Sequence, residues 1–246
     1  MITEAEIDSL AKRFEEKTPQ EILGWALKKF HPKIALASSF GAEDVVLIDM
    51  LCKLTPKPRV FTLDTGRLHQ ETYNLMDAIR ERYGIEIEVY FPNADSVEKM
   101  VREHGINLFY KSHDLRVLCC KVRKVEPLSR ALSSLDAWIT GLRREQAPSR
   151  ANIKKIEIDK VNRGIVKLNP LAEWSHEDVW NYIRENNVPY NKLHDHGYAS
   201  IGCVPCTRPV RPGEDPRAGR WWWERETARE CGLHYKLEEG RFLLKK

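Results

Sequence analysis

Two pairs of cysteines are the first residues in this sequence whose spacing suggests chemistry. Cys119 and Cys120 are adjacent in "RVLCCKVRKVEPL", and Cys203 and Cys206 form a C-x-x-C pair in "IGCVPCTRP". A disulfide between neighbours is disfavoured, because its Cα atoms prefer a separation of roughly 4.4–6.8 Å and adjacent residues lie only ~3.8 Å apart. Four thiolates can instead hold one tetrahedral zinc ion or one iron–sulfur cluster. Adjacent ligands suit the larger cluster better, and a redox C-x-x-C pair beside an unrelated Cys-Cys pair remains the alternative.

A single cysteine near the C-terminus is a candidate nucleophile. Cys231 lies in "ECGLHYK", beside Gly232 and three residues before His234. The preceding tail contains four arginines that would lower the pKa of the thiol and bind phosphate or sulfate oxygens: Arg208, Arg211, Arg217 and Arg220. Most lone cysteines are inert, and many basic tails are simply solvated. Three consecutive tryptophans at 221–223 argue against a solvated tail, because they are costly to leave in water.

Three short polar segments follow predicted strands and suit an anionic ligand. "SSFGAED" (38–44) offers the hydroxyls of Ser38 and Ser39 and backbone amides at a helix start, while "LDTGR" (63–67) and "TGLRR" (140–144) add turns with arginines. In an open parallel sheet such segments meet at the carboxyl ends of the strands, where ligands bind. Each alone is equally consistent with an ordinary turn, but together they predict a nucleotide or phosphate site. No Gly-Lys-Ser/Thr follows the serine turn, so it is not a P-loop.

Alternating strands and helices would position these groups. "TPQEILGWALKKF" predicts a helix over 19–30, with Thr18 as N-cap, Pro19 in the first turn and Glu21 closing a capping box. Strands are expected at 34–37, 85–91 and 137–142 and near 153–158 and 165–168, and a strand with its turn over 59–66. Helices are expected after the turn at 38–41, over 68–83 and 94–104, and after Ser175. This alternation predicts an α/β protein with an open, mostly parallel sheet and helices on both faces, in a Rossmann-like arrangement. We expect one domain over 1–206, with N-terminal helices in 1–31, and a loop-rich catalytic tail over 207–246.

The composition is that of a globular protein. Of 246 residues, 42% are apolar, which is enough for a substantial core. The 40 lysines and arginines exceed the 36 acidic residues by only four, which does not indicate nucleic acid, although 111–130 is locally basic. No signal-like start and no run of about 18 apolar residues is found, so we expect a cytoplasmic protein. Six cysteines in a reducing compartment favour metal binding or catalysis over disulfides, with Cys52 interpreted as a core residue.

Seven segments together resemble the assimilatory adenylyl-sulfate (APS) reductases, which share a family with the phosphoadenylyl-sulfate (PAPS) reductases. They are "SSFGAEDVVL", "LDTGRL", "CCKVRKVEPL", "ITGLRREQ", "GCVPCTRPV", "RPGEDPRAGRWWWE" and "ECGLH", within residues 34–236. The combination is far more specific than any one motif. The resemblance implies an adenine nucleotide alpha hydrolase-like fold and an oxidoreductase of sulfate assimilation and cysteine biosynthesis.

The resemblance also implies a mechanism. Cys231 would attack the sulfur of adenylyl sulfate, expel AMP and carry an S-sulfonate, from which a thioredoxin thiol releases sulfite. A 4Fe-4S cluster on Cys119, Cys120, Cys203 and Cys206 would tune the site rather than pass electrons. Matching family positions assign the other site residues: Lys124 and His234 to catalysis, Arg143, Arg144, Arg217 and Arg220 to the phosphosulfate, and Ser38, Ser39, Leu63 and Gly141 to the adenosine.

Other functions stay open at this point. Some cluster-bearing family members also accept the 3′-phosphorylated substrate, so a PAPS reductase or a dual-specificity enzyme is the first alternative. An ATP pyrophosphatase-type adenylating enzyme would carry a fuller Ser-Gly-Gly-x-Asp-Ser turn, and a zinc-bearing RNA-binding module would use the basic tail and Trp221 to Trp223. The expected partners are thioredoxin and a small-molecule substrate, with no nucleic acid and no membrane, and the family often forms homo-oligomers.

Overall fold

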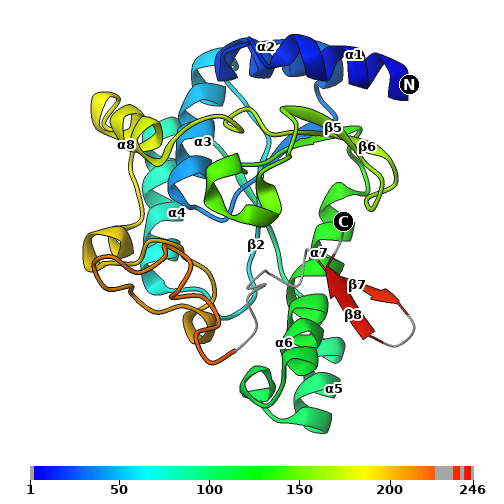
Figure 1. Cartoon of the computed structure of the whole chain (residues 1–246), viewed down its shortest axis with the longest axis vertical. Helices are drawn as coiled ribbons and strands as arrows, with labels where there is room; N and C mark the ends of the chain where they lie inside the picture. Colours follow the sequence, from blue (N-terminus) through cyan, green and yellow to red (C-terminus); the bar gives the residue numbers. More distant parts are fainter. Residues whose placement is uncertain (1–2, 225–234, 239–240, 245–246) are drawn as a thin grey trace. The chain divides into compact units, whose positions relative to one another are not determined.

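A computed structural model describes residues 3–224, 235–238 and 241–244 of the chain (Figure 1). The first half contains α1 (Glu4–Phe14), α2 (Pro19–Phe30), β1 (Ile34–Ala37), α3 (Ala42–Leu54), β2 (Val60–Leu63), α4 (Gln70–Tyr83), β3 (Ile87–Tyr90), α5 (Ala94–His104), the short helix η1 (Leu108–Tyr110) and α6 (His113–Cys120). The second half contains η2 (Lys121–Val125), α7 (Glu126–Leu132), β4 (Ala137–Ile139), η3 (Arg144–Gln146), η4 (Pro148–Arg150), β5 (Ile156–Asp159), β6 (Ile165–Leu168), α8 (His176–Glu185), η5 (Lys192–His196), η6 (Val204–Cys206), β7 (Tyr235–Glu238) and β8 (Arg241–Leu244).

The chain divides into two compact units that interleave along the sequence. The sheet unit comprises 1–62, 72–88 and 132–191, and the cysteine unit comprises 63–71, 89–131 and 192–246. Residues 192–224, on both sides of the expected domain boundary at 206, therefore belong to one unit. All four cysteines of the two pairs lie in the cysteine unit, whereas the serine turn at 38–41 and the arginine loop at 143–144 lie in the sheet unit.

The sheet has the strand order β3-β2-β1-β4-β6-β5. β1 pairs in parallel with β2 and with β4, and β4 with β6, while β5 is antiparallel to β6. Leu36 at the centre of β1 is in register with Val60 and Ile139. The chain proceeds outward from β1 to β2 and β3 and then returns to the other side of β1, so the switch point of the topology lies between β1 and β4.

Burial explains why these segments are strands. Ile34, Ala35 and Leu36 of β1 are at most 3% exposed, as expected for a strand covered on both faces of a parallel sheet. The edge strand β3 has no fully buried residue. The predicted open, mostly parallel α/β fold is confirmed.

Capping residues set the starts of the helices. Thr3, Thr18 and Ser175 are the N-caps of α1, α2 and α8, and each closes a capping box with an acidic residue three positions later. The helix predicted over 19–30 and the strands predicted at 34–37 and 165–168 have these bounds in the structure. The strand expected over 137–142 is shorter and ends at Ile139.

Two elements were not predicted. α6, η2 and α7 run on as one helix through the paired cysteines, seen in green in Figure 1, and η2 is a π-helical turn. The tail after residue 206 was expected to be loop-rich throughout, but β7 and β8 pair as an antiparallel hairpin. Within the described residues, no helix is long and apolar enough to cross a membrane.

Candidate active site

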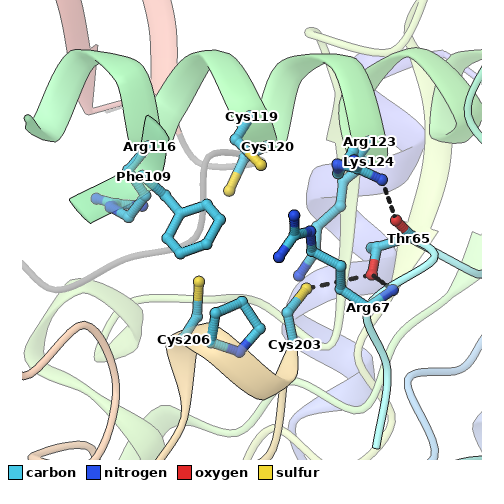
Figure 2. A pocket seen from close by; sticks show the side chains of 11 residues that line it. Thr65, Arg67, Phe109, Arg116, Cys119, Cys120, Arg123, Lys124, Cys203 and Cys206 are labelled. Atoms are coloured by element: carbon cyan, nitrogen blue, oxygen red, sulfur yellow. Dashed lines mark hydrogen bonds between the residues drawn. The ribbon is translucent and has the colours of Figure 1, made fainter. Parts of the chain in front are cut away.

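Four cysteines from two distant segments line one cavity in the cysteine unit. Cys119 and Cys120 come from the end of α6, and Cys203 and Cys206 from the η6 turn that faces it in Figure 2. The cavity measures about 320 Å³, counting the part open to solvent. The rest of its lining comprises four basic residues and three others: Arg67, Arg116, Arg123 and Lys124, with Thr65, Phe109 and Pro205.

The local fold directs each cysteine pair into the cavity. Ser112 caps α6 by accepting from the Leu115 amide at 3.2 Å, and the helix ends at Cys120, where the π-helical turn begins. That turn brings Arg123 and Lys124 onto the same cavity. In η6 the amide of Cys206 donates to the Cys203 carbonyl at 2.9 Å, and the Thr207 hydroxyl donates to the same carbonyl at 3.0 Å.

All four thiols are removed from solvent. Each of these cysteine residues is 8–9% exposed, and none forms a disulfide. Burial raises the pKa of Cys119, and burial together with the neighbouring Cys203 raises the pKa of Cys206 to about 12. The thiols of Cys119 and Cys206 are therefore protonated at neutral pH unless a metal replaces their protons, as metal ligation by cysteine does.

The donor set fits a cluster better than a single ion. Among the described residues, no three histidines, cysteines or acidic groups converge closely enough to hold one metal ion. The four sulfurs instead surround a larger space. One buried N–H group of the cavity lining, Arg123 Nε, has no acceptor in the described part of the chain, and the sulfides of an iron–sulfur cluster would supply one. The site thus has the ligands, the room and a donor for such a cluster.

A second group lies at the switch point of the sheet unit. Ser38 and Ser39 follow β1, as predicted, but the amide and the hydroxyl of Ser39 both donate to Asp44, at 2.6 and 2.8 Å. Burial is the largest effect on this carboxyl and raises its pKa to about 6. Gly141, after β4, is needed for close approach, since a Cβ there would lie 2.4 Å from Asp44 Oδ1. Asp44 was not among the predicted site residues, although an acidic residue in the first turn of a helix is a usual N-terminal signal.

The two arginines of the arginine loop are engaged within the sheet unit. Arg143 is 4% exposed and binds Glu43 at 2.8 Å and Glu145 at 2.9 Å. Arg144 binds Glu15 at 2.9 Å and Glu173 at 3.1 Å. Their predicted contact with a phosphosulfate stays a prediction, and it would compete with these ion pairs.

The remaining predicted residues are distributed as follows. Leu63, Lys124, Arg217 and Arg220 belong to the cysteine unit, and of these Lys124 lines the cavity. Arg220 is 6% exposed and donates to the Cys206 carbonyl at 3.3 Å and to the Ser200 hydroxyl at 3.2 Å. Cys231 and His234 lie outside the described residues.

Comparison with known proteins identifies the family. The model of the phosphoadenosine phosphosulfate reductase domain matches residues 33–209, which is most of the chain. The chain is 53% identical to an adenosine 5′-phosphosulfate reductase of Burkholderia cepacia over 83% of this chain and 81% of the relative. The chain belongs to this reductase family. An adenosine 5′-phosphosulfate reductase of Pseudomonas aeruginosa is 47% identical over 93% of the chain and 86% of the relative.

Solved structures agree with this membership of the reductase family. A phosphoadenylyl-sulfate reductase from Candida auris superposes with a TM-score of 0.73 at 34% identity, covering 85% of this chain and 98% of that one. A Candida glabrata FMN adenylyltransferase in complex with ATP has a TM-score of 0.56 at 18% identity, over 94% of this chain and 78% of that one, which shows a shared fold alone. The predicted family resemblance is confirmed, as is the prediction that the chain is an enzyme of this family.

Proposed function

We propose that this protein reduces adenylyl sulfate to sulfite and AMP, with Cys231 as the nucleophile and thioredoxin as the electron donor. The observation that carries the proposal is the convergence of four buried cysteines on one basic cavity in a chain about 50% identical to adenosine 5′-phosphosulfate reductases. Family membership favours a reductase over an adenylating enzyme or an RNA-binding module.

The first step forms a bond between two sulfur atoms. The Cys231 thiolate attacks the sulfur of adenylyl sulfate, the bond from that sulfur to the bridging oxygen breaks, and AMP leaves with the electron pair. A thiolate and a phosphosulfate repel each other, so cations are required. Lys124, which lines the cavity, would supply one, and by family correspondence His234, Arg217 and Arg220 would supply others, with Arg143 and Arg144 nearby.

The second step consumes two electrons from thiols. One thioredoxin thiolate attacks Cys231 Sγ, sulfite leaves with the electrons of the sulfur–sulfur bond, and a mixed disulfide forms. The second thioredoxin thiol then attacks the thioredoxin sulfur of that bond. Thioredoxin ends as a disulfide and Cys231 as a thiol, so the electrons balance.

The adenosine is assigned to the carboxyl ends of the strands. Ser38 and Ser39 at β1, Leu63 at the end of β2 and Gly141 after β4 are the proposed contacts. We further propose that Cys119, Cys120, Cys203 and Cys206 hold a 4Fe-4S cluster. When bound, the cluster would adjust the electrostatic field at the basic cavity without passing electrons to the substrate.

The decisive experiment measures whether sulfur from labelled substrate is transferred to the protein. Protein incubated with ³⁵S-labelled adenylyl sulfate in the absence of thioredoxin should carry label on Cys231, and added reduced thioredoxin should release it as sulfite. Cys231→Ser should take up no label while keeping its cluster absorbance. Label on another residue, or turnover by Cys231→Ser, contradicts the proposal.

Substrate choice is tested in the same assay. Relatives at 47–53% identity are named adenosine 5′-phosphosulfate reductases, whereas the Candida auris phosphoadenylyl-sulfate reductase is 34% identical. We therefore expect a higher kcat/KM for adenylyl sulfate than for its 3′-phosphorylated form. The reverse preference would assign the protein to the phosphoadenylyl-sulfate reductases.

A further inference from the structure

A buried ion pair connects the two cysteine-bearing segments of the cysteine unit. Arg116 lies on α6, one turn before Cys119 and Cys120. Its Nε donates to Glu224 Oε1 at 2.5 Å and its Nη2 to Glu224 Oε2 at 3.1 Å, so the two side chains meet as a two-pronged fork. The Arg116 side chain is 0% exposed and that of Glu224 is 8% exposed.

Trp221 continues this connection to the other cysteine pair. The guanidinium carbons of Arg116 and Arg220 each lie over the Trp221 ring, 4.6 Å from its centroid, so the ring makes cation–π contacts with both arginines. The Trp221 amide and Arg220 Nε both donate to the Cys206 carbonyl, at 3.3 Å each. We call Arg116, Trp221 and Glu224 the clasp.

The clasp holds its own backbone in an unfavourable conformation. Trp221 has a φ of +46°, in the left-handed region that bulky residues rarely adopt. The Glu224 amide donates to the Trp221 carbonyl at 2.9 Å and closes the turn. Such a conformation persists only where the surrounding contacts stabilise it. Here those contacts are made with α6 and with the C-x-x-C turn.

A buried ion pair is a poor device for stability alone. Replacing one by apolar side chains of similar volume is often neutral, because desolvation cancels much of the Coulombic attraction, and its better-supported role is to specify one arrangement. The clasp joins the elements that carry the paired cysteines and the C-x-x-C pair, and it ends seven residues before Cys231.

We propose that Arg116 and Glu224 are positioning residues, which fix the separation of the two cysteine pairs through protein contacts and fix the point from which the chain leads to Cys231. The second half of this statement rests on the proposed function. Seven residues span at most about 25 Å, which sets an upper limit on the distance between the Cys231 backbone and this anchor. Releasing the anchor would lower the effective concentration of the thiol at the substrate.

The test compares three full-length variants. Glu224→Gln removes the charge and keeps the shape, and the double variant Arg116→Met/Glu224→Leu replaces the pair by apolar side chains. Glu214→Gln is the matched control, because it breaks another Arg–Glu pair of the same segment, the half-buried contact of Arg208 with Glu214 at 3.1 Å. Thermal melting establishes which variants are folded.

Three readouts separate positioning from plain stability. We expect the double variant to melt near the wild type, yet to lose iron to a chelator about 10 to 100 times faster and to sulfonate Cys231 at saturating substrate about tenfold more slowly. In metal-free protein, mass spectrometry should find the four cavity cysteines alkylated faster in both clasp variants than in Glu214→Gln. A folded double variant with wild-type iron retention, alkylation and sulfonation would overturn the proposal.

The outcomes also distinguish this proposal from the proposed function. If wild-type protein forms no adduct with adenylyl sulfate, the proposed function fails, but the alkylation of the cavity cysteines still decides whether the clasp holds them together. If Glu224→Gln does not fold, the double variant carries the test. If neither variant folds, Arg116→Lys provides the test, because lysine keeps the positive charge but cannot make both hydrogen bonds to Glu224. Cavity cysteines alkylated at the wild-type rate in that variant would overturn the proposal.

Discussion

At the carboxyl end of β1, hydrogen-bond donors that were predicted to bind an anionic ligand bind a buried carboxylate of the chain itself. Asp44 accepts hydrogen bonds from Ser39, and its pKa is raised to about 6 from 3.8 because burial outweighs those bonds. A carboxyl with a raised folded-state pKa binds extra protons in the folded protein between roughly pH 4 and 6. The contribution of this group to the free energy of unfolding is greatest below about pH 4. It falls by about 3 kcal/mol as the pH rises through 6.

Asp44→Asn should remove this pH dependence. The amide oxygen can still accept one bond from Ser39, while the buried charge is gone. We expect the melting temperature of the variant, relative to the wild type, to increase from pH 4 to pH 7 and then level off. Calorimetry at several pH values measures it, with the exposed Asp95→Asn as a control for loss of one acidic group. A constant difference across this range would refute the buried, easily protonated carboxyl.

Lys124 is the second residue for which we predict the effect of a substitution, in this case on the rate of the reaction. It lines the cysteine cavity, whereas Lys121, three residues earlier in the same π-helical turn, is exposed and does not. Lys124→Ala should slow S-sulfonation by on the order of 100-fold, because the cation proposed to stabilise the departing AMP is lost. Lys121→Ala should leave single-turnover rates near those of the wild type. Equal rates in the two variants would remove Lys124 from the site.

At the scale of elements, the approach of β4 to α3 depends on the missing side chain of Gly141. A Cβ there would lie 2.4 Å from Asp44 Oδ1 and 2.9 Å from Glu43 Cβ, so the start of α3 would have to move. Gly141→Ala should cost about 1–3 kcal/mol of unfolding free energy and weaken adenylyl-sulfate binding. Gly24→Ala, in the interior of α2 with nothing within 4 Å, should instead be stabilising by about 1 kcal/mol. Urea titration of both variants decides whether the close approach is real.

Elements with local signals could be predicted from the sequence, and elements made by distant contacts could not. Thr18, Pro19 and Glu21 define the start of α2 by themselves, and the apolar run of β1 needs no partner to be recognised. The π-helical turn after Cys120 has no such local signal. It places Arg123 within 2.7 Å of the Thr65 carbonyl, a contact between residues 58 positions apart.

The same distinction holds for the site. The residue types of the two cysteine pairs indicated a shared metal centre, and the structure brings all four to one cavity. The spacing could not indicate that Ser39 is bound by Asp44, nor that Arg144 is held by Glu15 near the N-terminus. Those contacts depend on how the chain folds back, and the sequence alone does not specify which acidic group an arginine will meet.

At the scale of the whole molecule, the cysteine unit is assembled from three separate stretches of chain, 63–71, 89–131 and 192–246. The four cavity cysteines therefore meet only after folding has brought residues more than eighty positions apart together. A cofactor that binds the folded arrangement and not the unfolded chain stabilises it by mass action. Removal of the metal should thus lower the melting temperature and expose the thiols of this unit.

Iron content tests this assembly directly. Anaerobically purified protein should be brown and contain about four irons per chain, because four cysteines are the ligand set of one 4Fe-4S cluster. Cys206→Ser should lose most of the iron and the visible absorbance. Cys52→Ser should keep both, since Cys52 lies on α3 in the sheet unit, where burial raises the pKa of its thiol to about 11. Stoichiometric zinc in colourless protein would contradict the cluster, and equal iron loss in both variants would mean that the metal depends on the fold as a whole and not on the cavity.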